Sequence, residues 1–267
     1  MSICVAEDFV LTAVIPIKNS TRDINFLKTI IHQSHTERVK LVLVSDGAAD
    51  QISTVLQEIF ETVCTKCVLI LKKDFRNPGQ ARNEGIKNVN SEWIMFWDAD
   101  DQPNIKNIIE SVRKNHSKQV IIGQFSYFSN YTNQKSPKSN NSRLVQVSMN
   151  PGLWRIVMKK EIILHEFPAL RMGEDQVFLI ENDIFGKTLK ISDEEFYAYT
   201  IESDGQLTRD MTAIFELRFA IYRSIKAIIR KPDWKLYLYL IMIGKLMYSL
   251  VINYFRKVNH FERKAPK

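Results

Sequence analysis

The first hundred residues alternate between short apolar runs and segments whose apolar residues recur at helical spacing. The apolar runs cover residues 10–17, 39–47, 67–73 and 92–101, and the helical segments cover residues 23–33, 51–63 and 80–89. Short runs rich in Val, Ile and Leu are typical of strands that are buried on both faces. Their regular alternation with helices predicts an α/β fold with a mostly parallel sheet and helices on both sides.

Polar residues follow three of the four predicted strands. They are Lys18 to Ser20 after the first strand, Asp46 at the end of the second, and Asp98 to Asp101 after the fourth. Because the carboxyl ends of parallel strands meet at one edge of a sheet, a ligand site is predicted there. The sequence has no GxGxxG after the first strand and no GxxxxGKS or GxxxxGKT, so neither a Rossmann dinucleotide site nor a P-loop is predicted.

Beyond residue 104 the alternation is less regular. The pattern predicts a helix over 104–115, a strand over 120–128, a polar surface loop over 129–143, a half-exposed strand over 144–149 in a hairpin with the previous strand, a strand and turn over 152–163, and a helix over 173–185. The last of these helices begins with Glu174 and Asp175, so two carboxylates lie in its first turn.

Asp98, Asp100 and Asp101 place three carboxylates within four positions at a strand end. Charges this close repel one another unless a cation or hydrogen-bond donors compensate them. Carboxylate oxygens suit Mg²⁺ or Mn²⁺, and such an ion can bridge to a phosphorylated ligand. The alternative is a solvated turn in which Asp101 is only the N-cap of the helix that begins near residue 104.

Five short motifs occur in order along the chain. They are AVIPIKN at 13–19, VSDGAAD at 44–50, NPGQARNEG at 77–85, WDADD at 97–101 and GED at 173–175. Each is weak alone, but together they strongly resemble the family 2 glycosyltransferases of GT-A fold, over roughly residues 10–210. The resemblance implies that a sugar is transferred, with inversion, from a nucleotide-diphosphate donor to an acceptor hydroxyl.

The resemblance also implies roles on the donor side. The residues expected to bind the nucleotide sugar are Pro16, Ile17, Lys18, Asn19, Asp46, Arg82, Asp98, Ala99 and Arg209. The residues expected to bind the metal are Asp100 and Asp98. Thr200 stands where the family has a basic residue after the tyrosine, so the resemblance suggests Arg209 as its substitute. A surface arginine before a helix is the alternative for Arg209. The expected cofactor is divalent Mn²⁺ or Mg²⁺, which would stabilise the departing diphosphate as a Lewis acid.

On the acceptor side the family's acidic pair matches Glu174 and Asp175, with Asp175 as the general base. A carboxylate that removes the acceptor proton during attack on the anomeric carbon is worth about 10²–10⁴-fold in rate. The alternative is a pair of ordinary first-turn acids that the helix dipole favours.

Most of the positive charge lies at the C-terminal end. Residues 213–267 hold 12 basic and three acidic side chains, a formal charge of +9, whereas residues 1–212 carry −2. Residues 1–212 have no excess of basic side chains, so they do not offer the positively charged surface that nucleic acid needs. We therefore expect a catalytic domain over 1–212 and a helical appendage over 213–267.

The appendage consists of a basic amphipathic helix over 213–230 and an apolar segment over 236–252 that contains Gly244 and Lys245. A spanning helix needs about 20 apolar residues, so a helix that lies in the interface of an anionic membrane fits better. Packing of both helices on the catalytic body is the alternative.

The sequence thus predicts a metal-dependent glycosyltransferase at the cytoplasmic face of a bacterial inner membrane, because the N-terminus lacks the basic start of a signal peptide. The expected partners are a UDP-sugar, a glycan or lipid-linked acceptor of surface-glycan assembly, and the membrane surface. Two alternatives are a catalytically silent membrane-binding module and a sugar nucleotidyltransferase, which would need a Gly-rich signature at the first strand.

Overall fold

The computed structural model describes residues 9–17, 21–46, 68–73, 75, 77–129, 132–201, 211–230 and 235–262. Within these residues, nine strands form one sheet in the order β3-β2-β1-β4-β8-β6-β9-β5, with β7 paired to β6. The strands are β1 (Leu11–Ile17), β2 (Val39–Asp46), β3 (Val68–Lys73), β4 (Trp93–Phe96), β5 (Gln102–Pro103), β6 (Val120–Ser129), β7 (Gln134–Lys135), β8 (Ile156–Lys159) and β9 (Leu189–Ile201). β1 to β4 are parallel, and β8 runs antiparallel to both of its neighbours. The predicted mostly parallel sheet is confirmed.

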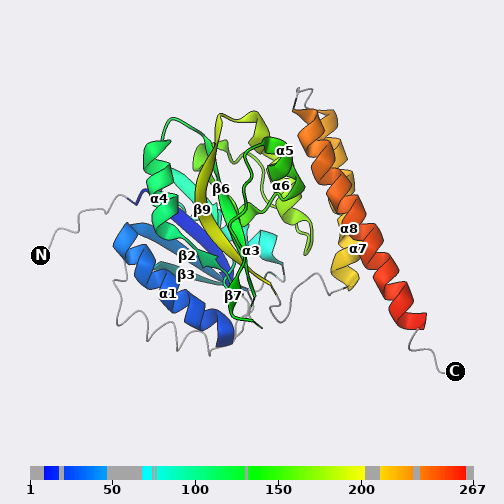
Figure 1. Ribbon diagram of the computed structural model, residues 1–267, viewed down its shortest axis with the longest axis horizontal. Coiled ribbons are helices and arrows are strands. Elements are labelled where there is room, and N and C mark those ends of the chain that lie inside the picture. Colours follow the sequence, from blue (N-terminus) through cyan, green and yellow to red (C-terminus); the bar gives the residue numbers. More distant parts are fainter. Residues whose placement is uncertain are drawn as a thin grey trace, which may run out of the picture.

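Helices cover both faces of this sheet (Figure 1). They are α1 (Thr21–Glu37), α3 (Pro78–Lys87), α4 (Ile105–Lys114), α5 (Leu144–Met149), α6 (Glu174–Glu181), α7 (Met211–Ile229) and α8 (Leu236–Glu262), with 3₁₀ turns at Leu153–Arg155, Lys160–Ile162 and Ile184–Gly186. Leu11, Ala13 and Ile15 of β1 pack with side chains of α1 and α4 in what we call the first core. Val14 packs with side chains of α3 and α6 in a second core. Because β1 is buried on both faces, its sequence is continuously apolar rather than alternating.

The strand predicted over 144–149 is wrong, because these residues form helix α5. In six residues the period of a strand and the period of a helix fit equally well. Leu144 and Val147, three positions apart, both contact the second core. The side chain of Gln146 also accepts hydrogen bonds from the backbone N–H groups of Ser142 and Arg143, at 2.9 and 3.0 Å, which favours a helix start. The hairpin partner of β6 is instead the short β7.

The 13-residue strand β9 was not predicted as a strand. Three consecutive acids, Asp193 to Glu195, interrupt its apolar pattern. β9 pairs with β6 in parallel, and the register shifts on either side of Gln124. Such an irregularity breaks the two-residue period on which strand prediction depends. The helix predicted over 51–63 lies outside the described residues.

At the C-terminal end, α7 and α8 lie side by side as a separate layer against α6 and α5 (Figure 1). Leu238, Tyr239 and Met242 of α8 are buried in the second core. The alternative of packing on the body is therefore present in the structure. Among the described residues, one helical stretch, Leu236–Asn253, is long and apolar enough to cross a membrane; its mean hydropathy is 1.6 and 28% of it is buried.

Candidate functional site

The carboxyl ends of β1, β2 and β4 lie next to one another at one edge of the sheet. In the strand register Ile17 is opposite Ser45, and Val14 is opposite Phe96. The backbone N–H of Trp97 donates to the Val14 carbonyl at 3.1 Å, which continues the β4 pairing by one residue. The loop that carries the three aspartates therefore leaves the sheet at this edge, where ligands of α/β proteins bind.

The NPGQARNEG segment forms the beginning of α3. Asn77 is the N-cap, and its Oδ1 accepts a hydrogen bond from the backbone N–H of Gln80 at 2.8 Å. Pro78 follows in the first turn, where a missing N–H costs nothing. A Cβ at Gly85 would lie 2.3 Å from Cγ1 of Val14, so this glycine lets the helix pack directly on β1.

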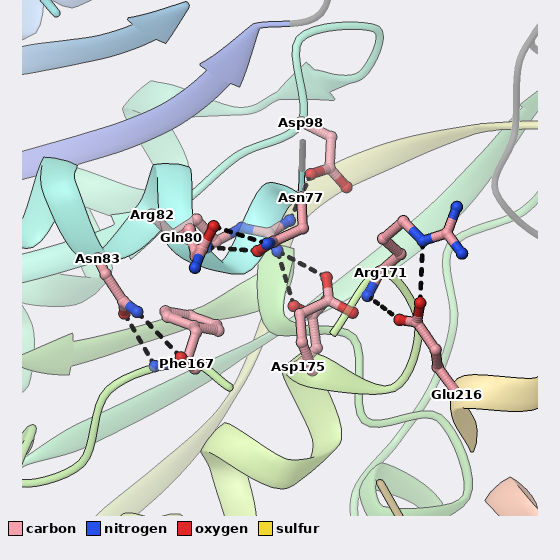
Figure 2. A network of polar contacts seen from close by, with 10 residues as sticks. Asn77, Gln80, Arg82, Asn83, Asp98, Phe167, Arg171, Asp175 and Glu216 are labelled. Atoms are coloured by element: carbon pink, nitrogen blue, oxygen red, sulfur yellow. Dashed lines mark hydrogen bonds and ion pairs between the residues drawn. The ribbon is translucent and has the colours of Figure 1, made fainter. Parts of the chain in front are cut away.

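Two further residues of α3 hold the loop that precedes α6. A Cβ at Gly79 would lie 2.9 Å from the carbonyl oxygen of Pro168, so the loop passes directly over this glycine. Asn83 donates its amide to the Phe167 carbonyl at 2.9 Å and accepts from the Phe167 N–H at 2.8 Å (Figure 2). This two-way bond fixes α3 relative to the start of α6, although 84 residues separate the two partners.

Arg82 lies at the centre of the site and contacts three carboxylates from two other segments (Figure 2). Its Nη2 is 2.9 Å from Oδ1 of Asp98 in the loop after β4. Its Nη1 is 3.0 Å from Oε1 of Glu174 and 2.8 Å from Oδ1 of Asp175, both in the first turn of α6. Arg82 is only 4% exposed. One guanidinium therefore joins the predicted donor side of the site to the predicted acceptor side.

The charges of this cluster shift its pKa values. Burial would lower the pKa of Arg82, but the charges of Asp175, Asp98 and Glu174 outweigh burial and raise it. Burial raises the pKa of Glu174 well above its usual value, and the charge of Asp175 raises it further against the effect of Arg82. Burial also raises the pKa of Asp175, which Arg82 opposes. A carboxylate whose pKa lies closer to neutrality is a better proton acceptor than an unperturbed one.

The aspartate loop is held by β9. The backbone N–H of Asp98 donates to the hydroxyl of Tyr197 at 2.8 Å. Oδ1 of Asp101 accepts from the backbone N–H of Thr200 at 2.6 Å, and Asp101 is only 1% exposed. The alternative in which Asp101 is only the N-cap of the next helix is wrong, because Asn104 is the N-cap of α4. Asp101 instead joins the loop to the sheet.

The aspartate loop fits a divalent cation. Burial, followed by the charges of Asp98 and Asp100, raises the pKa of Asp101 well above its usual value. Oδ2 of Asp101 is buried without a hydrogen-bond partner. In the part of the chain that the structure describes, no three His, Cys, Asp or Glu side chains form a ready metal cage. The carboxylates of this loop suit an ion that is held by one or two protein carboxylates and by the phosphates of a substrate.

The start of α6 is fixed by α7. Gly173 precedes Glu174 with φ 83°, a left-handed conformation that favours glycine. A Cβ there would lie 2.8 Å from Cβ of Ala220 on α7. The backbone N–H and the Nε of Arg171 donate to the carboxylate of Glu216 on α7, at 2.6 and 3.0 Å (Figure 2). The C-terminal layer therefore contacts the residues immediately before Asp175.

The structure thus brings Arg82, Asp98, Glu174 and Asp175 together, as one site requires. Ala99 and Asp100 lie in the same loop. At the end of β1 the side chain of Ile17 is buried in the first core, so only its backbone can face a nucleotide, and Pro16 is half-buried. Lys18, Asn19, Arg209 and the side chain of Asp46 lie outside the described residues. Their roles stay predictions.

Tyr197, Asn83 and Glu216 position the site, and the sequence alone did not assign them these roles. Asn83 lies inside a recognised motif, but its partner in the 167–168 loop has no sequence pattern. A buried tyrosine needs a partner for its hydroxyl, yet the sequence does not say which one. Glu216 had a signal, since it is the one acid of the otherwise basic segment 213–230.

Comparison with known proteins agrees with this geometry. The family described as Glycosyl transferase family 2 matches residues 12–187. A poly(ribitol-phosphate) beta-N-acetylglucosaminyltransferase, TarS of Staphylococcus aureus, is 21% identical over 207 residues, which are 73% of this chain. The chain spans 36% of the length of that relative.

Two solved structures share the fold. S. aureus TarS 1–349 in complex with UDP-GlcNAc superimposes with a TM-score of 0.65 at 16% identity, over 96% of this chain and 76% of that one. The mannosyltransferase PcManGT of Pyrobaculum calidifontis, in complex with GDP-Man and Mn²⁺, superimposes with a TM-score of 0.63 at 13% identity, over 97% of this chain and 77% of that one. The fold is GT-A.

Proposed function

Because this chain belongs to glycosyl transferase family 2, we propose that it is an inverting transferase that moves a sugar from a nucleotide diphosphate to an acceptor hydroxyl. One observation carries the proposal. Arg82 contacts Asp98 at 2.9 Å and Asp175 at 2.8 Å, so a carboxylate of the donor side and a candidate base bond to different nitrogens of one guanidinium. Both reacting partners can then meet at this edge of the sheet.

Asp175 is the proposed general base. Its side chain is 30% exposed, whereas that of Glu174 is 9% exposed. The acceptor oxygen bonds to the anomeric carbon from the face opposite the leaving group, and its proton passes to a carboxylate oxygen of Asp175. The bond from the anomeric carbon to the diphosphate oxygen breaks with its electron pair. Glu174, the more buried acid, holds Arg82 and positions the site without taking the proton.

Asp98 and Asp100 are the proposed holders of the divalent cation. Such a cation, when bound, neutralises the charge that develops on the diphosphate. The unpartnered oxygen of Asp101 and the negative charges of Asp98 and Asp100 beside it support a cation nearby. The complex of PcManGT with GDP-Man and Mn²⁺ supports the same assignment by analogy of fold.

The proposed donor is a UDP-sugar, supported by the complex of TarS 1–349 with UDP-GlcNAc. Pro16 to Asn19, Asp46, Ala99 and Arg209 are the residues proposed to surround the nucleotide with Arg82. The proposed acceptor is a hydroxyl of a bacterial surface glycan or of its lipid-linked precursor. The name of TarS, a transferase to poly(ribitol-phosphate), supports an acceptor of this broad kind.

A donor-binding and turnover panel tests the function. Calorimetry with UDP-, GDP- and dTDP-sugars, each with and without Mn²⁺, should find one donor that binds only with the metal. Asp100→Ala should lose that binding. Asp175→Asn should keep it and lose turnover by about 10²–10⁴-fold. Asp193→Asn, an exposed carboxylate on β9, is the matched control and should change neither. Failure of every donor to bind under every metal condition would contradict the proposal.

A further inference from the structure

The C-terminal layer has two very different faces. Toward the body, α7 buries Leu217, Ala220 and Ser224, and α8 buries Leu238, Tyr239, Met242, Ile243 and Leu246. Away from the body, large apolar side chains are exposed at helical spacing. They are Phe215, Phe219, Tyr222, Ile225 and Ile229 on α7, and Tyr237, Leu240, Met247, Tyr248 and Val251 on α8. We call these ten residues the outer face.

Three residues of the outer face are mostly exposed. Tyr222 is 67% exposed, Ile229 is 76% exposed and Tyr248 is 66% exposed. A Cβ placed at Gly244, between the exposed positions of α8, would meet no atom within 4 Å. Exposed apolar side chains that recur at helical spacing along two adjacent helices indicate an interaction surface rather than scattered surface residues.

The charge around the outer face has one sign. The guanidinium of Arg218 lies over the rings of Phe215 and Phe219, with its carbon 5.9 and 5.1 Å from the ring centres. Lys226 on α7 and Arg230, the residue after its end, are also exposed. Among the described side chains of α7 and α8, the one acid is Glu216, and it is bonded to Arg171 on the inner side. The whole segment 213–267 has a formal charge of +9.

We infer that the outer face docks on the surface of an anionic lipid bilayer. Apolar and aromatic side chains interleaved with cations are what a helix needs to lie in the interface of such a membrane. A second copy of this chain fits less well, since a twofold contact would bring two faces of the same positive charge together. This inference goes beyond the proposed transfer and does not depend on it.

The inner contacts of α8 favour docking over spanning. The hydroxyl of Tyr239 donates to Oδ1 of Asp183 at 2.6 Å and accepts from the backbone N–H of Phe185 at 3.1 Å. Lys245 donates to Oδ1 of Asn150 at 3.0 Å. A helix that crossed the bilayer would have to break these bonds and uncover the second core. A helix that lies on the bilayer keeps them.

Docking in this orientation would place α6, whose first turn carries Glu174 and Asp175, close to the lipid. α7 contacts Gly173 on its inner side and carries the outer face on its opposite side. A helix is about 10–12 Å in diameter, so roughly one helix would separate the membrane surface from the beginning of α6. The arrangement suits an acceptor that is itself tethered to the membrane.

Flotation of the full-length protein with lipid vesicles tests the inference. Wild type should float with vesicles of phosphatidylcholine and phosphatidylglycerol, and should float at least tenfold less with phosphatidylcholine alone. The double variant Phe219→Glu, Tyr248→Glu should lose at least tenfold of the binding to anionic vesicles. Leu164→Glu is the matched control, because Leu164 is 72% exposed but lies on the body, and it should bind like wild type.

Circular dichroism and thermal unfolding should be unchanged in both variants, because each replaced side chain is exposed. Deletion of the helices is not a usable test, since it would uncover the core around Val177 and Phe178. The inference is overturned if wild type ignores anionic vesicles, or if the double variant binds them as wild type does. It is also overturned if light scattering finds a wild-type dimer that the double variant abolishes while vesicle binding is absent.

Discussion

Two arginines are buried among the described side chains, and their surroundings are opposite. Arg82 is 4% exposed, and three carboxylates contact its terminal nitrogens. Arg155, at the end of the 3₁₀ turn before β8, is fully buried, and none of the described carboxylates pairs with it. Its Nη2 donates to the Asn150 carbonyl at 2.6 Å, whereas its Nε and Nη1 have no hydrogen-bond partner.

The pKa values follow this difference. The carboxylates raise the pKa of Arg82 against the effect of burial. Burial lowers the pKa of Arg155 to about 10. The guanidinium of Arg155 lies 4.8 Å from the ring centre of Phe125, a contact worth about 0.5–2 kcal/mol. The comparison shows that burial alone does not tell what an arginine contributes, because the contribution depends on the charges that surround it.

The largest effect is expected from Arg82→Met. The replacement leaves three carboxylates close together without their counter-charge, and breaking a buried ion pair in this way costs about 3–5 kcal/mol. Urea denaturation should therefore show the free energy of unfolding falling by that amount. Asp98 and Asp175 would also lose their common partner, so turnover should be lost even at temperatures where the variant is folded.

Arg82→Lys is the control for this prediction. A lysine keeps the positive charge but cannot bond the carboxylates with two nitrogens in one plane. It should recover most of the lost stability and little of the lost turnover. A cost below about 1 kcal/mol for Arg82→Met would mean that the three carboxylates are compensated by other groups.

The parallel half of the sheet could be predicted from the sequence because its signals are local. β1 is buried on both faces, so an uninterrupted apolar run identifies it without any knowledge of its neighbours. The antiparallel half depends on distant contacts. β9 follows the irregular register of β6, and α5 is a helix because Leu144 and Val147 both reach the second core. Neither the register of β6 nor the burial of Leu144 and Val147 can be read from the local sequence alone.

The site could be predicted as a set of residues but not as a geometry. The motifs pointed to Arg82, Asp98 and Asp175, and the structure brings these side chains within hydrogen-bonding distance. The role of Arg82 as the link between carboxylates had no local signal, since its partners lie 16 and 93 residues away. The same holds for Tyr197, whose hydroxyl accepts from a backbone 99 residues away.

A smaller loss of stability is expected from a change in the backbone at Gly173, which precedes two of the carboxylates that contact Arg82. In Gly173→Ala the new Cβ would lie 2.8 Å from Cβ of Ala220, in a residue with φ 83°. Left-handed strain costs roughly 1–2 kcal/mol, so we expect a loss of about 2 kcal/mol in thermal or urea unfolding. Gly244→Ala is the control, because its φ is not positive and its Cβ would meet no atom within 4 Å. An unchanged stability of Gly173→Ala would show that α7 moves freely relative to α6.

Arg155→Met should have a smaller effect still and is the direct test of the contrast. The lost contact with Phe125 is offset by removal of an uncompensated buried charge, so we expect a change below about 1.5 kcal/mol. A loss above 3 kcal/mol would mean that Arg155 is paired as well as Arg82 is.

The lowered pKa of Arg155 also predicts in which direction the stability of the protein changes with pH. Burial lowers its pKa to about 10 in the folded protein, below the ordinary value of an arginine, so above a pH of about 10 the unfolded chain binds more protons. Stability from this group then rises with pH in that range. Wild type should therefore gain stability relative to Arg155→Met between pH 9.5 and about 11, as measured by urea unfolding. An opposite slope would contradict the lowered pKa.

The smallest effect is expected where the same ion-pair chemistry lies at the surface. Arg223 on α7 donates to Glu181 on α6, with Nε–Oε1 at 2.6 Å, and its side chain is 45% exposed. Water and salt screen such a pair, so Arg223→Ala should cost about 0.2–1 kcal/mol in urea unfolding. A double-mutant cycle with Glu181→Gln isolates the pair, and its coupling should fall further in 0.5 M salt. If this coupling were as large as the cost of Arg82→Met, burial would not be the reason why the ion pairs of Arg82 stabilise the protein more than that of Arg223.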